Sequence, residues 1–311
     1  MSLYITIDGG TTNTRIALVR DRVIVDSIKL HVGARRGIEN KELLVSEIKD
    51  AIERLLKNSD LLPSDVASIL ASGMITSEFG LCHLEHISAP AGIRELHDEI
   101  EKVRLPAISE IPFAFIRGVR IPCADFEKLD VMRGEETELM GILNAEWGDS
   151  IYILPGSHSK IIKVDARGRI SDFSTMMTGE MISALSEGTI LKDAVDLELS
   201  EIDQDYLLMG YDFSAENGIN KALFKVRILK NFCSCNKVEA YSFFLGAVLC
   251  GEIKEIIESL AKTVVLGGRA QIKNAMAEIL IKRDNKKIIL LDEKTVDAST
   301  SLGAVRIYEN S

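Results

Sequence analysis

The sequence predicts an α/β protein made of two domains. At 311 residues the chain is longer than one hydrophobic core usually serves, since single cores stop growing near about 250–300 residues. Three β-type runs followed by alternating strand and helix patterns occur at the start, and three further β-type runs appear in the second half. We therefore expect residues 1–118 to form one domain and residues 119–311 to form a second domain of related architecture.

The first domain opens with two apolar runs on either side of a polar turn, which predicts a β-hairpin. A third run alternates well enough to be their antiparallel neighbour, and strand and helix patterns then follow one another. Three antiparallel strands followed by strand–helix alternation is the ribonuclease-H-like order. The predicted strands are Tyr4–Ile7, Ile16–Val19, Val23–Leu30, Val66–Leu70 and Ile111–Ile116, and the predicted helices are Lys41–Leu56 and Gly92–Val103.

The second domain repeats this antiparallel opening, as a duplicated architecture predicts. Its predicted strands are Ile151–Leu154, Ser159–Val164, Ile170–Phe173, Val264–Leu266 and Lys287–Leu291. Its predicted helices are Glu135–Ala145, Met181–Leu191, Ile202–Met209, Ala215–Asn231, Tyr241–Leu260, Gln271–Ile281 and Ala298–Tyr308.

Composition narrows the class of protein. The formal net charge of −10 argues against extended contact with nucleic acid or an anionic membrane. Five scattered cysteines do not suggest a disulfide framework. The most apolar later stretch, residues 243–250, is only about half a membrane span, and the first residues do not have a leader-peptide pattern. We expect a cytoplasmic protein that binds no nucleic acid and no membrane.

The polar turn of the opening hairpin is the first candidate site. Glycines there permit positive φ and a close approach of ligand to backbone, and successive N–H groups with hydroxyl and amide donors suit an anion. Asp8, at the end of the first strand, is placed to hold hydrated Mg²⁺ beside a polyphosphate. The candidate phosphate contacts are Asp8, Gly9, Gly10, Thr11, Thr12 and Asn13.

Two later turns and one acidic segment are weaker signals by themselves. The turn that includes Gly156, Ser157, His158, Ser159 and Lys160 offers open backbone, hydroxyl donors and a positive charge. Gly267 and Gly268 follow a buried strand and offer flat backbone to a nucleoside. Asp130, Glu135 and Glu136 lie at or before a predicted helix start, where acids also commonly just complement the helix dipole.

The opening hairpin resembles the first phosphate motif of the actin, heat-shock chaperone and sugar kinase superfamily. Four sequence strings, which occur in one order, make the chain resemble more specifically the 2-keto-3-deoxygalactonokinase family. This resemblance extends from the hairpin to residues 297–303. The four strings are Gly73-Met74-Ile75-Thr76-Ser77, Met132-Arg133-Gly134-Glu135-Glu136-Thr137, Pro155-Gly156-Ser157-His158-Ser159-Lys160 and Met177-Thr178-Gly179-Glu180. The chain departs from the family pattern with serine at position 157 in place of threonine and isoleucine at 161 in place of tryptophan.

The resemblance implies two ribonuclease-H-like, actin-like ATPase domains with an active-site cleft between them. It also implies transfer of the ATP γ-phosphoryl group to the 6-hydroxyl of 2-keto-3-deoxygalactonate, with ATP and Mg²⁺ as cofactors. The turn at residues 156–160 then becomes the second phosphate motif and Gly267–Gly268 the adenosine motif. A carboxylate must accept the hydroxyl proton; we expect Glu135, then Glu136, then Asp130. Expected substrate contacts are Arg15, Gly73, Met74, Ser77, Arg120, Arg133 and Thr178, with Arg120 and Arg133 chosen to pair with a carboxylate.

Two other functions stay open at this point. A non-catalytic sugar-acid sensor would use the same fold, and a phosphohydrolase would replace the sugar hydroxyl by water. The partner expected for the kinase and for the sensor is a small sugar acid, and a homodimer is compatible with the sequence.

Overall fold

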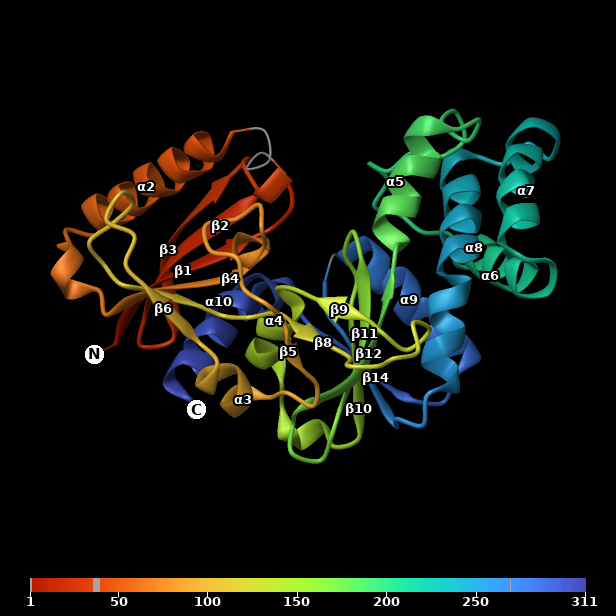
Figure 1. Cartoon of the computed structure of the whole chain (residues 1–311). Coiled ribbons are helices and arrows are strands. Elements are labelled where there is room, and N and C mark those ends of the chain that lie inside the picture. The colour runs from red at the N-terminus through yellow and green to blue at the C-terminus, as the bar shows by residue number, and fades with distance from the viewer. Residues whose placement is uncertain (1, 36–39, 269) are drawn as a thin grey trace. The chain divides into compact units, whose positions relative to one another are not determined.

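The computed structural model describes residues 2–35, 40–268 and 270–311, and these form two compact units (Figure 1). The first unit comprises the chain up to Ala145 together with Val164–Asp172 and Lys294–Ser311. The second comprises Glu146–Lys163 and Phe173–Glu293. The boundary between the compact units therefore lies later in the chain than the predicted boundary at residue 118, and the end of the chain belongs to the first unit. The two ribonuclease-H-like domains at 1–118 and 119–311 stay a prediction.

The first unit is built on a six-stranded sheet with the order β3-β2-β1-β4-β7-β6. The first three strands are antiparallel, and β4 and β7 add in parallel to β1, which confirms the predicted order of strands. The strands are β1 Leu3–Gly9, β2 Thr14–Arg20, β3 Val23–Leu30, β4 Ser68–Gly73, β6 Glu101–Val103 and β7 Phe113–Phe115.

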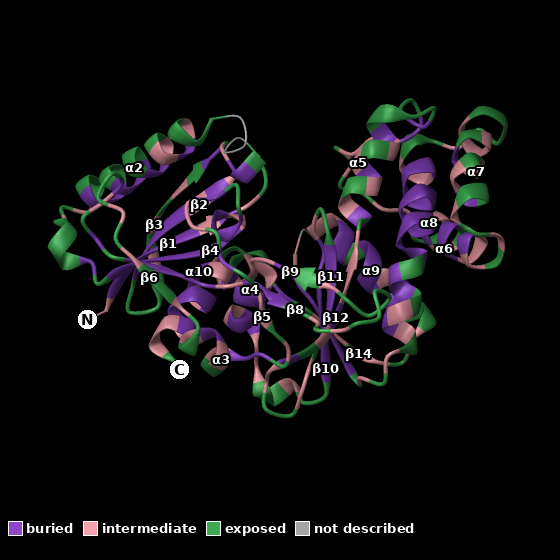
Figure 2. Cartoon of the chain, viewed as in Figure 1, coloured by how far each residue is buried: buried purple, intermediate pink, exposed green. Residues whose placement is uncertain are grey.

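Helices cover both faces of this sheet. Helix α2 (Lys41–Asn58) is capped by Asn40, whose side chain accepts the Leu43 N–H, and it buries an apolar stripe against β2 and β3 (Figures 1 and 2). On the opposite face the Thr6 hydroxyl donates to Ser301 of α10 (Glu293–Glu309) over 2.8 Å. Helix α10 packs on α4 (Glu135–Ile142) at glycines, because a Cβ on Gly141 would lie 1.9 Å from the Ser299 carbonyl oxygen.

The segment after β4 is where the sequence prediction was wrong. The helix predicted over Gly92–Val103 ends early: α3 spans Ile93–Asp98, and β6 follows at Glu101–Val103. Backbone pairing with β7 and an ion pair from Arg117 to Glu101 at 3.1 Å hold the extended conformation. Tertiary pairing here overrides helical periodicity. A small sheet of β5 (Ile87–Ser88), β8 (Val119–Arg120) and β9 (Val131–Met132) lies in the same unit.

The second unit contains a five-stranded sheet with the order β12-β11-β10-β13-β14. β10 and β11 are antiparallel, whereas β13 and β14 run parallel with β10, so the second half repeats the hairpin of the first. The strands are β10 Ser150–Leu154, β11 Ser159–Val164, β12 Ile170–Met176, β13 Thr263–Leu266 and β14 Lys287–Leu290.

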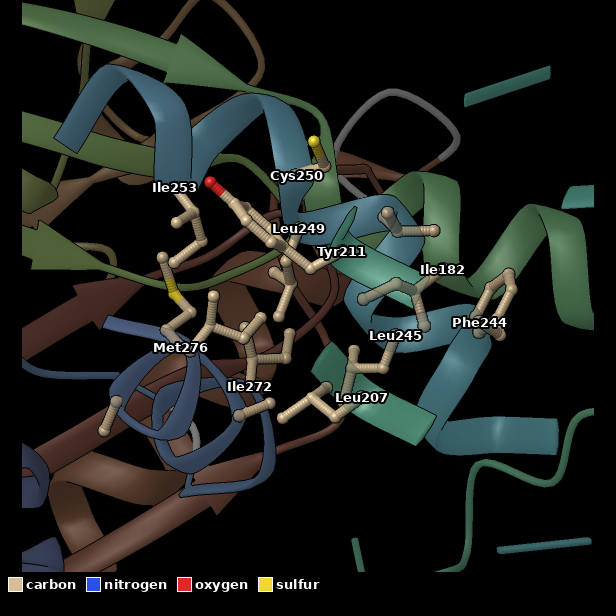
Figure 3. Close-up of a cluster of buried hydrophobic side chains, with 14 of the residues drawn as sticks. Ile182, Leu207, Tyr211, Phe244, Leu245, Leu249, Cys250, Ile253, Ile272 and Met276 are labelled. Carbon is tan, nitrogen blue, oxygen red and sulfur yellow. The ribbon is translucent and has the colours of Figure 1, made fainter. Parts of the chain in front are cut away.

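A helical layer packs on this sheet around the buried helix α8. Figure 3 shows its core, where Leu245, Leu249 and Ile253 of α8 meet Leu207, Ile272 and Met276. The helices are α5 Thr178–Gly188, α6 Gln204–Asn217, α7 Ile219–Phe232, α8 Lys237–Glu258 and α9 Ala270–Arg283. The predicted break after Met209 is wrong, since the chain turns at Gly218 with φ +82°. Among the described residues, no helix is both long and apolar enough to cross a bilayer.

Candidate active site

The first turn, residues 9–13, joins β1 and β2 and is held by backbone contacts. The Gly10 N–H donates to the Asn13 carbonyl over 2.8 Å, and the Ala34 and Arg35 N–H groups donate to the carbonyls of Gly10 and Thr11, each over 3.0 Å. Thr11 and Thr12 are exposed, so their hydroxyls face solvent beside a stiffened backbone. This is the geometry expected of an anion-binding turn.

Glycines bring three chain segments together next to this turn. Gly73, at the end of β4, has φ +81°, and a Cβ there would lie 2.5 Å from the Gly9 carbonyl oxygen. A Cβ on Gly134, which has φ +116°, would lie 3.2 Å from the Gly73 Cα. Residues other than glycine rarely adopt such φ values. The absence of side chains thus lets the start of α4 approach the end of β1, where Asp8 lies.

The acids of α4 and Asp8 form one electrostatic cluster within the first unit. Burial raises the pKa of Asp8 to about 6, with Arg15 lowering it, Glu135 raising it and a Thr300 hydrogen bond lowering it. Burial raises the pKa of Glu138 to about 8, and Asp8 and Glu135 raise it further. Glu138 and Thr300 were not predicted from the sequence. The signal for Glu138 was its spacing, since positions three apart share a helix face.

The two predicted candidates for the general base lie in different surroundings. Glu135 is half-buried at the helix start, and its Oε2 accepts the Arg133 N–H over 3.0 Å. Glu136 is 0% exposed and accepts from the Gly134 N–H over 2.8 Å and the Thr137 hydroxyl over 3.0 Å. Burial, and next the charge of Glu135, raise the pKa of Glu136 to about 8. A base must reach the proton that it accepts, so this placement does not favour Glu136. Asp130 lies before β9 and its Oδ1 accepts the Val131 N–H.

Arg133 is already engaged inside the first unit. Its guanidinium donates to the Thr76 carbonyl over 2.8 Å, to the Thr76 hydroxyl over 2.6 Å and to the Leu84 carbonyl over 3.0 Å. The contacts fix the loop after β4, whose 3-10 turn Met74–Thr76 precedes Ser77. The Ser77 hydroxyl in turn donates to the Met74 carbonyl over 2.7 Å. These predicted substrate contacts therefore form a hydrogen-bonded loop, and their contact with a sugar stays a prediction.

The other predicted arginines differ from Arg133. Arg15 forms an ion pair with Asp297 of α10 at 3.1 Å and lowers the pKa of Asp8 through its charge. It therefore supports the acid cluster. Arg120 is exposed in β8.

The second turn, residues 155–158, joins β10 and β11 and rests on the start of α5. A Cβ on Gly179 would lie 2.2 Å from the Gly156 carbonyl oxygen, and the Glu180 N–H donates to the Ser157 carbonyl over 3.1 Å. His158 Nε2 lies 3.3 Å from Glu180 Oε1. Ser157 and His158 are exposed, whereas Ser159 and Lys160 are buried at the start of β11. Of the predicted contacts, those before Ser159 are therefore the accessible ones.

The predicted adenosine motif lies against this turn within the second unit. β10 and β13 are parallel, so their carboxyl ends lie side by side. Gly267 follows β13, and its N–H donates to the Ile153 carbonyl over 2.9 Å. Gly268 has φ +69°, and a Cβ there would lie 2.3 Å from the Pro155 carbonyl oxygen. The structure thus brings together these two motifs, which are about 110 residues apart in the chain.

The donors around Asp8 fit a magnesium ion. Asp8, Glu135 and Glu138 are carboxylates, the ligand type that Mg²⁺ prefers, and their mutual repulsion is the kind that a cation relieves. No group of three or more His, Cys, Asp and Glu side chains in the described ranges is arranged to hold a metal by itself.

Comparison with known proteins identifies the family. A profile described as 2-keto-3-deoxy-galactonokinase matches residues 8–301. The chain belongs to this family. The matched range contains both turns, the acids of α4 and the glycines after β13, so the predicted resemblance is confirmed.

Individual relatives agree with that membership. The 2-dehydro-3-deoxygalactonokinase of Escherichia coli (strain K12) is 25% identical over 265 residues, which cover 83% of this chain and 82% of the relative. A Sinorhizobium meliloti crystal structure, named as a candidate 2-dehydro-3-deoxygalactonokinase, matches with a TM-score of 0.78 at 21% identity, over 99% of this chain and 96% of that one.

A third comparison concerns the fold alone. Component A of the Acidaminococcus fermentans (R)-2-hydroxyglutaryl-CoA dehydratase matches with a TM-score of 0.56 at 14% identity, over 100% of this chain and 99% of that one. These structural likenesses support the predicted actin-like fold class of the kinase family.

Proposed function

We propose that this chain transfers the γ-phosphoryl group of ATP to the 6-hydroxyl of 2-keto-3-deoxygalactonate, a step of galactonate catabolism. The observation that carries the proposal is the cluster of Asp8 and the α4 acids beside the first turn, in a chain whose family profile matches residues 8–301. Phosphoryl transfer needs little covalent chemistry from the protein, so positioned oxygen ligands, phosphate donors and one base suffice.

The residues divide these tasks by their positions. Asp8 would hold Mg²⁺, which supplies charge stabilisation at the phosphates when bound. Backbone and hydroxyl donors of the first turn, and of Gly156, Ser157 and His158 in the second, would bind the phosphates, while Gly267 and Gly268 would pack on the nucleoside. That both turns serve one nucleotide is part of the proposal.

We propose Glu135 as the group that accepts the proton of the sugar hydroxyl. It is half-buried at the start of α4 and belongs to the same cluster as Asp8. Glu138 replaces Glu136 as the second candidate because it lies on the same helix face as Glu135 and is not fully buried. For the substrate carboxylate we favour exposed Arg120 over Arg133, whose donors are engaged with Thr76 and Leu84.

The test is a coupled assay of ADP release with a panel of keto-deoxy sugar acids, including both epimers at the carbon that distinguishes galactonate from gluconate derivatives. We expect ADP release that depends on Mg²⁺ and on a sugar acid. Equal ADP release without any sugar would identify a phosphohydrolase, and sugar binding without ADP release would identify a sensor. Either result overturns the proposed kinase.

The proposal also covers the cellular location and the oligomeric state of the protein. The cytoplasm is where ATP and a sugar-acid intermediate would meet. A homodimer is the assembly we propose, and its test is the mass of the protein in solution.

A further inference from the structure

A buried acid lies behind the second turn and has no part in the mechanism proposed above. Glu252 is on α8, the helix at the centre of the second unit's core, and is 3% exposed. Glutamate is almost never fully buried unless it is paired. Its surroundings therefore decide what it does.

Glu252 connects two elements that carry the second turn. The Thr178 hydroxyl, at the first residue of α5, donates to Glu252 Oε2 over 2.6 Å. The Ser159 hydroxyl, at the first residue of β11, is near enough to lower the pKa of Glu252. Yet Ser159 Oγ and Glu252 Oε1 are both buried without a full hydrogen bond in the described part of the chain. Burial has the largest effect and raises the pKa of Glu252 to about 7.

A displacement of Thr178 or Ser159 would displace the second turn directly. Gly179, which follows Thr178, leaves no room for a Cβ, because that atom would lie 2.8 Å from the Ser157 Cα. The Glu180 N–H donates to the Ser157 carbonyl, and Glu180 also contacts His158. The start of α5 thus forms the floor beneath Ser157 and His158. Ser159 continues the same backbone into the sheet.

We propose that Glu252 is a positioning residue for the nucleotide phosphates. From α8 it holds Thr178 by a hydrogen bond and lies near Ser159, and through Thr178 and the start of α5 it sets the backbone of the second turn. The inference rests on the proposed function in one respect, that this turn binds phosphate. A buried carboxyl adds little stability of its own, so the expected consequence of its loss is a change in the geometry of the turn.

The test measures nucleotide binding directly, with a fluorescent N-methylanthraniloyl derivative of ADP and Mg²⁺. The variants are Glu252→Ala, Glu252→Gln and Thr178→Val, which removes the donor at nearly constant volume. Glu255→Ala is the matched control, because Glu255 is on the same helix and accepts from Ser174 of β12 instead. Circular dichroism and thermal midpoints establish that each variant is folded.

We expect Glu252→Ala and Thr178→Val to weaken nucleotide binding about tenfold, and Glu252→Gln to restore it to within about twofold, because an amide can still accept from Thr178. The KM for the sugar acid should not change in Glu252→Ala or Glu252→Gln. Amide hydrogen exchange at residues 156–160 of the nucleotide-free protein should increase in Glu252→Ala and not in Glu255→Ala.

Two results would overturn the inference. One is wild-type nucleotide affinity in folded Glu252→Ala or Thr178→Val. The other is a general effect on the second unit. It would appear as an equal loss of nucleotide affinity in Glu255→Ala, or as parallel changes in nucleotide affinity and in the KM for the sugar acid in Glu252→Ala. A wild-type protein that binds nucleotide but releases no ADP with any sugar acid refutes the kinase proposal instead and leaves this inference in place.

Discussion

The two hairpin turns share a topology but place their carboxyl groups on opposite sides. In the first unit, Asp8 ends strand β1 directly before the turn, and the α4 acids lie beside it. In the second, Leu154 and Pro155 occupy the corresponding strand end, and the acid Glu252 lies buried behind the turn. The comparison teaches that the same kind of β-hairpin can serve two purposes. We propose that the first turn meets phosphate together with a metal, and the second meets phosphate alone.

The supports of the turns also differ. The first is held by backbone bonds from Ala34 and Arg35, which depend on no side chain. The second is held by α5, whose first residue depends on the Glu252 carboxyl. Single side-chain changes should therefore affect chemistry in the first unit and geometry in the second.

The largest expected effect concerns the base in the first unit. Glu135→Gln should lower turnover about 10²–10⁴-fold with little change in nucleotide affinity, because it removes a proton acceptor and preserves shape. Glu136→Gln should turn over almost normally, since that side chain is buried. Turnover and nucleotide dissociation constants of both variants, with Glu138→Gln, provide the measurement. A dead Glu138→Gln beside an active Glu135→Gln would move the base by one helical turn; activity in all three would place it elsewhere.

A metal-binding role for only one turn predicts unequal effects of two substitutions. Asp8→Asn should lower turnover about 10²–10³-fold, because charge stabilisation at the phosphates is lost. Ser157→Ala in the second turn removes one neutral hydroxyl and should cost about tenfold or less. Both should fold, which thermal unfolding checks. Turnover of Asp8→Asn is measured over a range of Mg²⁺ concentrations. Near-normal turnover would contradict the assignment of the metal to Asp8.

Glycine substitutions compare the backbone packing around the two turns. Gly73→Ala should lower the free energy of unfolding by about 1–3 kcal/mol, because it combines φ +81° with a Cβ placed 2.5 Å from the Gly9 carbonyl oxygen. Gly179→Ala should lower it similarly, through overpacking on Gly156 and Ser157 without the strain of a positive φ. Gly188, at the end of α5, is the control, because a Cβ added there would have no neighbouring atom within 4 Å and alanine should be tolerated. Denaturant titration measures all three; equal stability of Gly73→Ala and Gly188→Ala would contradict the packing.

The last prediction is a pH dependence of stability in the absence of nucleotide. The raised pKa values are about 6 for Asp8, 7 for Glu252 and 8 for Glu136 and Glu138. Above their ordinary values, the unfolded chain has released these protons while the folded protein retains them. Stability should therefore fall as pH rises from about 4 through about 8.

The same measurement separates the two units. Thermal midpoints between about pH 5 and about pH 8 should fall less steeply in Glu136→Gln and Glu252→Gln than in the wild-type protein, because each variant removes one such proton. The acid cluster of the first unit contains three of the four groups, so most of the slope should persist in Glu252→Gln. An unchanged slope in Glu136→Gln would show that this carboxyl does not titrate as described.

Local patterns in the sequence were sufficient for much of the fold. The opening hairpin, the third strand and the strand Ser159–Val164 follow from alternation and turn residues alone, which depend on near neighbours. The two errors have different causes. Residues 101–103 have a helical pattern but form a strand because β7, a separate segment, pairs with them. The break between α6 and α7 is local and lies at Gly218, whose φ is positive.

The sequence by itself determined the family, the two hairpin turns and the helix on which the acids lie, because these depend on strings of adjacent residues. Only the tertiary structure decided which acids matter together. It buried Glu136, placed Glu138 near Asp8, brought Thr300 from the end of the chain to the same carboxyl and set Glu252 behind the second turn. The periodicity of the sequence predicts which residues share a helix face, but it does not predict which residues that face contacts. Burial and charge coupling depend on distances through space between residues far apart in the chain, and only the folded packing sets those distances.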